Sequence, residues 1–160
     1  MIGVDFAAEM LSVARAKLER LGERRVALAR GDAMAIPLPD DSVDAVTIGF
    51  GIRNVARAET VAREIVRVLR PGGRLAILEF GTPSLPGLRG AYLFYFRRVL
   101  PVIGRLVSHH NDAYSYLPAS VAAFPSPDAF LSLLRAAGFS DVRVVPLTFG
   151  IVYLFVARKA

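Results

Sequence analysis

A short apolar segment near the middle of the chain most constrains the fold. Residues 43–50, VDAVTIGF, are rich in β-branched side chains and lie between the acidic pair Asp40-Asp41 and Gly51. A run of this length and composition favours a strand buried on both faces over a helix. Strands buried on both faces belong to parallel sheets with helical crossovers, so the segment predicts an α/β fold.

The residues at the end of this expected strand are polar. In open α/β sheets the ligand binds beyond the carboxyl ends of the strands. Gly49, Gly51, Arg53 and Asn54 stand at that end. We therefore expect the functional site at this tip.

Strand and helix patterns alternate along most of the chain. Expected strands lie at residues 2–5, 26–29, 43–50, 74–80, 142–145 and 151–157, and expected helices at 8–21, 57–69 and 129–137. Pro71-Gly72-Gly73 is expected to stop the second helix, and Ser126-Pro127-Asp128 to begin the third. The last two strands are expected to form an antiparallel pair at one edge of the sheet.

Residues 82–126 do not follow this alternation. Their first part, residues 88–106, is apolar and aromatic with interspersed arginines: Arg89, Arg97, Arg98 and Arg105. It either packs on the core as an inserted helix or covers a hydrophobic substrate, with the arginines reaching lipid phosphates. Both interpretations need the same residues. Residues 109–120, HHNDAYSYLPAS, are expected to form a polar aromatic loop.

Composition narrows the class of protein. A length of 160 residues suits one domain, and the absence of cysteine excludes disulfides and thiolate chemistry. No secretory leader pattern is present, and no stretch reaches roughly 18 uncharged apolar residues, so we expect a cytoplasmic protein. The net charge of +6 comes mostly from dispersed arginines without a nucleic-acid-binding signature, so we expect no nucleic-acid partner.

Two acidic residues follow consecutive expected strands. Asp5 is placed to accept hydrogen bonds from ribose hydroxyls, and Asp32 from an adenine amino group with Ala33 and Met34 against the ring. Each also has a local interpretation, Asp5 as a helix cap and Asp32 as an Asx-turn residue. Their occurrence at two neighbouring strand ends favours a nucleotide-containing cofactor.

Four motifs together resemble class I methyltransferases that use S-adenosylmethionine: VDFAAEML, GDAMAIPLPDDSVDAV, FGIRNV and RVLRPGGRLAILEF. More narrowly, they are similar to the quinone-biosynthesis C-methyltransferase family, which methylates demethylmenaquinol or the related ubiquinone precursor. HNDAYSYLPASV and AGFSDVRVVPLTFGIV also match, so the resemblance covers essentially the whole chain. It implies a three-layer Rossmann-like sheet, mostly parallel with an antiparallel C-terminal edge, in one domain (residues 1–160) with a substrate-side helical insertion at about 82–126.

On the cofactor side, the resemblance implies roles for particular residues. Asp5 binds the cofactor ribose, Asp32 and Ala33 hold the adenine, and Gly49 lines the cofactor site. Members of the family often have serine in place of Gly49, so this chain offers only backbone polar groups there.

On the substrate side, Arg53 and Asn54 match the polar strand tip of the family, and further matches lie in its substrate-side loop: Asp112, Tyr114, Tyr116 and Ser120. A quinol ring carbon attacks well only when a neighbouring hydroxyl loses its proton, so the site needs a base or a group that stabilises the phenolate. Arg53, with Asn54, suits phenolate stabilisation.

The proton acceptor is left open. Asp112 or a water bound by a tyrosine such as Tyr116 is a candidate base. His109 and His110 are alternatives, although adjacent loop histidines are usually exposed, and no metal-ligand set accompanies them.

The chain departs from the family at its front. Members begin with a strand, a glycine-rich loop and a helix, where the glycines allow close approach to the methionine part of the cofactor. Neither Gly49-Phe50-Gly51 nor Pro71-Gly72-Gly73 replaces that loop. The missing strand is central in the family's sheet, between the strands expected at 2–5 and 43–50. We expect a truncated sequence, a fragment or one half of a split protein.

The resemblance implies S-adenosylmethionine as the methyl donor and a prenylated quinol as the substrate, with demethylmenaquinol preferred. Because that substrate carries a polyprenyl tail, we expect peripheral contact with the inner face of the membrane. We also expect either a homo-oligomer or a complementing N-terminal polypeptide. The alternatives are a non-catalytic methyltransferase-like subunit and half of a nicotinamide dehydrogenase. The sequence contains no dinucleotide-binding fingerprint to support the dehydrogenase.

Overall fold

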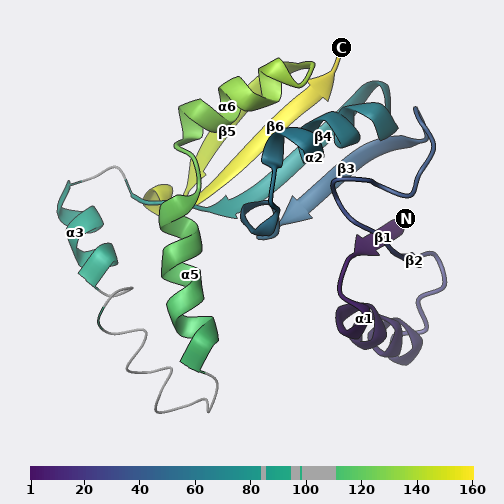
Figure 1. Cartoon of the computed structure of the whole chain (residues 1–160), viewed down its shortest axis with the longest axis horizontal. Helices are drawn as coiled ribbons and strands as arrows, with labels where there is room; N and C mark the ends of the chain where they lie inside the picture. The colour runs from purple at the N-terminus through teal and green to yellow at the C-terminus, as the bar shows by residue number, and fades with distance from the viewer. Residues whose placement is uncertain (84–85, 95–97, 99–110) are drawn as a thin grey trace.

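The computed structural model describes residues 1–83, 86–94, 98 and 111–160 (Figure 1). Its helices and strands, in chain order, are β1 (Ile2–Asp5), α1 (Ala8–Arg20), β2 (Ala27–Arg30), β3 (Val43–Gly49), α2 (Ala58–Val68), β4 (Leu69–Phe80), α3 (Pro86–Phe94), α5 (Asn111–Ala123), α6 (Pro127–Ala136), β5 (Phe139–Leu147) and β6 (Val152–Lys159). Short 3-10 turns follow β3 and β5: η1 (Ile52–Asn54) and η3 (Thr148–Gly150).

The strands of the described chain form two sheets. β1 and β2 are a parallel pair, and the larger sheet has the order β3-β4-β6-β5. In the larger sheet β3 and β4 are parallel, whereas β6 is antiparallel to both β4 and β5. Only β6 therefore runs in the reverse direction. The antiparallel C-terminal pair predicted from the sequence is confirmed, and both of its strands are longer than expected.

The two sheets are not joined by strand pairing within the residues that the structure covers. β1 pairs only with β2, and β3 only with β4. Figure 1 shows the β1–α1–β2 unit standing apart from the larger sheet, on its β3 side. The facing edges of β1 and β3 are therefore open, with backbone groups available for another strand. This is the position at which sequence analysis expects a strand to be missing.

The hydrophobic core lies between the larger sheet and helices α2 and α6 (Figure 1). Apolar residues recur at helical spacing on both helices, so each buries one face. The buried side chains include Val61, Ile65, Leu75, Ile77, Phe130, Leu134 and Phe155. The rings of Phe130 and Phe155 meet edge to face with centroids 4.8 Å apart. This core holds β3 and β4, and with them the predicted tip.

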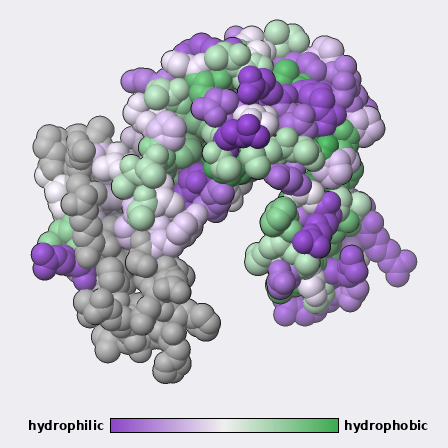
Figure 2. Space-filling view, viewed as in Figure 1, coloured by the Kyte–Doolittle hydropathy of each residue, from purple (hydrophilic) through white to green (hydrophobic). Residues whose placement is uncertain are grey.

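The smaller unit has little core of its own. Helix α1 contains no buried residue. Large apolar side chains are exposed throughout it: Met1, Ile2, Phe6, Met10, Val13 and Leu21. Figure 2 shows hydrophobic surface on this unit, among charged residues. The unit therefore has apolar surface that a further element could cover.

The start of α6 is as predicted. The Ser126 hydroxyl accepts a hydrogen bond from the backbone N–H of Ala129 at 3.3 Å, and Pro127 occupies the first turn. Gly138 follows the helix with a φ of +106°, a conformation that side chains rarely adopt.

The expectation that the central strand is buried on both faces is wrong. Along β3, Asp44, Ala45, Thr47 and Gly49 are exposed. The reason is that β3 is an edge strand of the larger sheet, because only β4 pairs with it.

Pro71-Gly72-Gly73 follows the end of the preceding helix, as predicted, but it does not separate that helix from the next strand. Helix α2 ends at Val68, and β4 begins at once at Leu69 rather than at Arg74. The pairing with β3 then jumps by several residues of β4, so the Pro-Gly-Gly sequence forms an irregularity within the strand. Gly72 has a φ of +76°, which suits glycine at such a bulge.

The polar loop expected at residues 109–120 is also wrong where it can be judged. Residues 111–120 belong to helix α5, which even contains Pro118. Leu117, Val121 and Phe124 recur at helical spacing, and Val121 is buried. That apolar stripe outweighs the local polarity. His109 and His110 lie outside the described residues, as does most of the expected cover at 88–106.

None of the helices described here is long and apolar enough to cross a bilayer.

Candidate functional site

The polar residues singled out from the sequence lie at the carboxyl ends of parallel strands. Asp5 is the last residue of β1, and Asp32 follows β2. Arg53 and Asn54 form the η1 turn directly after β3. Asp5 and Asp32 belong to the smaller sheet and the Arg-Asn tip to the larger one, so the open edges of β1 and β3 separate the two groups.

Both carboxylates make local backbone hydrogen bonds. Oδ1 of Asp5 accepts from the N–H of Ala7, and Oδ1 of Asp32 from the N–H of Met34, each at 2.8 Å. These are Asx turns, so the local interpretation holds for Asp32, whereas the residue at the start of α1 is Ala7 rather than Asp5. Each turn uses one carboxylate oxygen, which leaves Oδ2 to accept a hydrogen bond from a ligand.

The segment after Asp32 is apolar and packed. Ala33, Met34 and Ile36 are partly buried against the hydrophobic core. Gly31 makes this possible, because a Cβ atom there would lie 2.6 Å from Pro37 Cδ. Asp32 is therefore followed by an apolar surface of the kind that an adenine ring would contact.

Arg67 and Glu64 of α2 hold this segment in place. Glu64 Oε2 accepts from the N–H of Ile36 at 2.8 Å. Arg67 donates to the carbonyl oxygens of Ile36 and Leu38 at 2.9 and 2.8 Å, and pairs with both Glu64 and Asp40. The hydrogen bonds that Arg67 donates lower the pKa of Glu64, and by donating to Glu64 and Asp40 the guanidinium has its own pKa raised.

Gly49, the last residue of β3, faces open space. It is exposed, and a Cβ atom at this position would have no heavy atom within 4 Å. The backbone of Gly49 is thus accessible to a ligand. The open space would also accommodate a serine side chain, which members of the similar family often have at this position.

The tip beyond β3 is built around a buried ion pair. Glu79, near the end of β4, is 0% exposed, and its Oε1 lies 2.6 Å from Nη1 of Arg53, whose side chain is 10% exposed. The backbone at Phe50 takes a φ of 55°, a strained value for a residue other than glycine. Two contacts hold it there: its ring lies 4.4 Å from that of Phe80, and its carbonyl accepts from Arg53 Nη1.

Helix α5 brings further polar groups to this tip. The Tyr116 hydroxyl donates to Asn54 Oδ1 at 2.9 Å. Arg53 Nε donates to Ser120 Oγ at 3.3 Å. The structure therefore brings together four residues that sequence analysis assigned to the substrate side, Arg53, Asn54, Tyr116 and Ser120. The side chains of Asp112 and Tyr114 lie outside what the structure describes.

Sequence analysis missed Glu79. Glu79 lies within the motif RVLRPGGRLAILEF, and nothing in that motif assigns it a role of its own. A signal was present, because Glu79 is the acidic residue in an otherwise apolar strand segment, residues 75–80. Buried carboxylates need a charged or hydrogen-bonding partner, which would have pointed to an arginine nearby.

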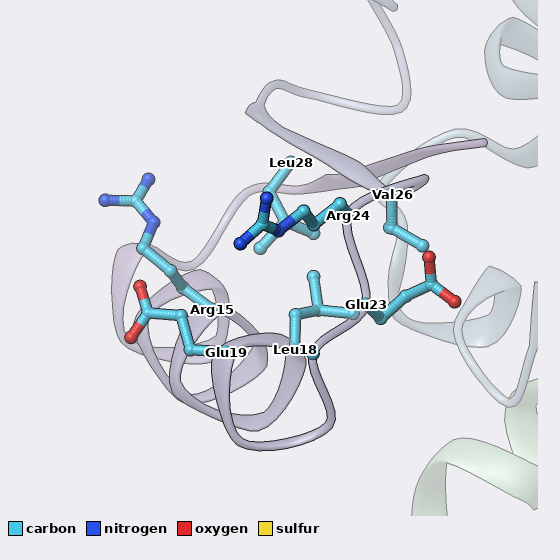
Figure 3. A pocket seen from close by; sticks show the side chains of 8 residues that line it. Arg15, Leu18, Glu19, Glu23, Arg24, Val26 and Leu28 are labelled. Atoms are coloured by element: carbon cyan, nitrogen blue, oxygen red, sulfur yellow. The ribbon is translucent and has the colours of Figure 1, made fainter.

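A hollow of about 400 Å³ lies elsewhere, between the C-terminal half of α1 and the start of β2 (Figure 3). Its lining includes Arg15, Leu18, Glu19 and Arg24, and none of the residues proposed for the cofactor or the substrate. The hollow is therefore separate from the polar residues at the strand ends.

Comparison with known proteins identifies the family. The ubiE/COQ5 methyltransferase family matches residues 1–159. The chain belongs to the ubiE/COQ5 methyltransferase family.

Relatives in this family are demethylmenaquinone methyltransferases. The protein of that name from Thermus thermophilus is 49% identical over 159 residues, which cover 99% of this chain and 71% of the relative. The one from Geobacillus stearothermophilus is 44% identical over 157 residues, which cover 98% of this chain and 67% of the relative. This ubiE/COQ5 family member thus spans about seven tenths of the length of each relative.

Solved structures show the same fold. A SAM-dependent methyltransferase from Aquifex aeolicus matches with a TM-score of 0.70 at 21% identity, covering 99% of this chain and 68% of the other. The phosphoethanolamine N-methyltransferase 2 of Haemonchus contortus, solved with S-adenosyl-L-methionine, matches with a TM-score of 0.71 at 16% identity, covering 99% of this chain and 43% of the other. The fold is that of class I methyltransferases, and the family uses S-adenosylmethionine as its methyl donor.

The residues of this ubiE/COQ5 family member fit that cofactor. Two carboxylates with an unused oxygen follow β1 and β2, an apolar surface follows Asp32, and the backbone at Gly49 is open. These groups match a ribose, an adenine ring and a polar chain in chemical type.

The stability that the segment after Asp32 gains from its contacts with α2 should depend on the charge of Glu64. Because the pKa of Glu64 in the folded protein lies below its ordinary value of 4.5, its contribution to the free energy of unfolding is present above that pH. The contribution is lost as pH falls through the lowered pKa. We expect Glu64→Gln to lower the free energy of unfolding at pH 7 by about 1 kcal/mol, the scale of a partly exposed ion pair. At pH 3 the difference in free energy of unfolding between the variant and wild type should be smaller.

Urea unfolding from pH 3 to 7 measures this difference. Glu59→Gln, an exposed acid of the same helix, is the control and should change the pH dependence little. A gap between wild type and Glu64→Gln that is constant over this pH range would contradict the interpretation.

Proposed function

We propose that this chain forms the substrate side and most of the cofactor side of an enzyme that methylates a ring carbon of a prenylated quinol, most directly demethylmenaquinol. The cluster of Arg53, Asn54 and Tyr116 at the carboxyl end of β3 supports this proposal. The names of the Thermus and Geobacillus relatives support the choice of substrate. The ubiquinone precursor is the alternative quinol.

On the cofactor side, Asp5 accepts hydrogen bonds from the ribose hydroxyls through Oδ2, and Asp32 holds the adenine amino group. Ala33 and Met34 contact the ring, and the backbone of Gly49 lines the rest of the site. S-adenosylmethionine, when bound, supplies an electrophilic methyl group on a sulfonium.

On the substrate side, the quinol ring carbon must become nucleophilic as it takes up the methyl group. A guanidinium carries only donor groups, so Arg53 is proposed to stabilise the developing phenolate and not to take the proton. Asn54 accepts from Tyr116 through Oδ1 and orients the substrate through its NH₂ group. The hydroxyl proton passes to Asp112 or to a water held by Tyr116, and the ring carbon that has gained the methyl group then loses its own proton to solvent, which restores the aromatic ring.

The chain is proposed to act as one domain whose insertion at about residues 82–126 faces the substrate. The arginines of that insertion would contact anionic lipid headgroups at the membrane surface, where a polyprenyl quinol is found.

A second candidate is a methyltransferase-like part that is inactive until another polypeptide segment, or a second chain, completes it. Three observations favour it: the open edges of β1 and β3, the separation of Asp5 and Asp32 from the Arg-Asn tip, and the exposed apolar surface of the β1–α1–β2 unit. A parallel strand between β1 and β3 would join the two sheets into one. A glycine-rich loop after that strand would approach the methionine part of the cofactor.

Titration calorimetry with S-adenosylmethionine distinguishes the candidates. We compare the chain with an extended version, defined as the chain fused to the N-terminal segment of the Thermus thermophilus relative. We expect binding only by the extended version, with a Kd on the order of micromolar. An extension whose loop glycines are replaced by valine should fail to bind. Equal affinity of the chain and the extended version would show that no completing segment is needed.

Asp32→Asn in the extended version tests the adenine contact. The variant keeps the Asx turn, because Asn also offers Oδ1, but replaces the ligand-binding oxygen with an NH₂ group. We expect S-adenosylmethionine affinity to fall about tenfold or more, as for loss of a charged hydrogen bond. Asp128→Asn, in the first turn of α6, is the matched control and should bind as wild type. Unchanged affinity in Asp32→Asn would remove Asp32 from the site.

A further inference from the structure

The carboxylate of Glu79 is fully buried, and two of its hydrogen bonds within the described residues come from Arg53 at the tip. Oε1 accepts from Arg53 Nη1 at 2.6 Å and from the backbone N–H of Phe80 at 2.9 Å. Oε2 accepts from the backbone N–H of Arg53 at 3.3 Å. Removing either partner of a buried pair leaves an uncompensated charge, so Glu79 constrains both the backbone and the guanidinium of Arg53.

Arg53 extends that constraint to a third element. Its Nη1 also donates to the Phe50 carbonyl at 2.6 Å, and its guanidinium lies 5.5 Å from the centroid of the Phe80 ring. Its Nε donates to Ser120 Oγ on α5. We call these contacts the Glu79–Arg53–Ser120 network. It links the end of β4, the turn after β3 and helix α5.

Helix α5 has separate apolar and polar attachments to the rest of the protein. Near its C-terminal end Val121 is buried, and just beyond the helix the Phe124 ring lies 5.1 Å from that of Phe130. Figure 1 shows the remainder of α5 extending away from the sheet. The side-chain hydrogen bonds that tie it to the tip are those of Tyr116 and Ser120, among the residues whose side chains are described. Apolar packing thus holds the C-terminal end of α5, and the hydrogen bonds of Tyr116 and Ser120 set the direction in which the helix runs from there.

We propose that Glu79 is a positioning residue for the substrate. Acting through Arg53 and Ser120, it fixes where α5 passes the carboxyl end of β3, and so holds Tyr116 against Asn54 at the place proposed for the quinol ring. The inference rests on the proposed function, because α5 is there the substrate side of the site. It goes further in assigning a role to a residue that need not touch the substrate.

This role is separable from stabilising the core. Buried ion pairs add little net stability compared with apolar replacements, although they can fix a particular geometry. Glu79 lies at the end of β4 next to the site, and its partner Arg53 is in the η1 turn rather than among the packed apolar residues. A purely structural carboxylate would affect all elements of the larger sheet together, whereas a positioning residue affects α5 first.

Amide hydrogen exchange of the chain, followed by mass spectrometry, tests the positioning directly and without catalysis. In Glu79→Gln and in Ser120→Ala we expect residues 116–123 to exchange about tenfold faster, the scale of losing a hydrogen bond to a charged group. Residues 128–136 of α6 should exchange as in wild type. The double variant should add little to Glu79→Gln, because both changes act through one guanidinium.

The Ser120 hydroxyl donates to the carbonyl of Leu117 in its own helix, and the Ser132 hydroxyl donates in the same way to the carbonyl of Asp128 in α6. Ser132→Ala is therefore the matched control, because Ser132 makes no hydrogen bond to a site residue within the described part of the chain. It should leave residues 116–123 unchanged. Wild-type exchange at 116–123 in Glu79→Gln would overturn the proposal. Equally faster exchange in α5, α6 and β4 would overturn it too, by showing a general loss of structure.

Methyl transfer by the extended version separates this proposal from the proposed function. We expect Ser120→Ala to raise the KM for demethylmenaquinol about tenfold while S-adenosylmethionine affinity stays within about twofold of wild type. An inactive extended wild type would contradict the proposed function. The hydrogen-exchange rates would still test whether the Glu79–Arg53–Ser120 network positions α5. An active wild type with an unchanged quinol KM in Ser120→Ala would contradict the positioning role alone.

Discussion

A carboxylate with no access to water needs a cation beside it, and the tip of the larger sheet is arranged around that requirement. Glu79 is fully buried, so Arg53 must stay against it, and the turn after β3 is held by both its backbone and its guanidinium. The strained backbone of Phe50 persists because the same contacts fix it. Asn54 is then presented beside Tyr116 of α5. One electrostatic constraint thus sets the geometry of the substrate side.

The cofactor side depends on a different constraint, the need of strand edges for partners. β1 and β3 each have an open edge, and the unit that carries Asp5 and Asp32 exposes apolar side chains over much of its surface. The network of Glu64 and Arg67 nevertheless ties the segment after Asp32 to the larger sheet through α2. Contacts through α2 therefore link the two parts of the proposed site, although no strand pairing joins them within the described residues.

Local and periodic signals in the sequence predicted most elements, because they arise from neighbouring residues. The cap at Ser126 and the extended segment at 43–49 are examples. The errors concern interactions between distant parts of the chain. The composition of β3 predicts burial on both faces, but the residues of a strand do not indicate whether it pairs with one neighbouring strand or with two. The helix at 111–123 was hidden by its polar side chains, and the pairing of Arg53 with Glu79 joins residues far apart in the sequence.

Residues of both sheets are proposed to line a single cofactor site: Asp5 and Asp32 through their side chains, and Gly49 through its backbone. The most direct measurement is the NMR amide spectrum of the extended version as S-adenosylmethionine is added. The account predicts that the amides of Ala7, Met34 and Gly49 shift together, while those of Leu18 and Arg24 beside the α1–β2 hollow do not. Shifts confined to that hollow, or to the residues of one sheet, would contradict it.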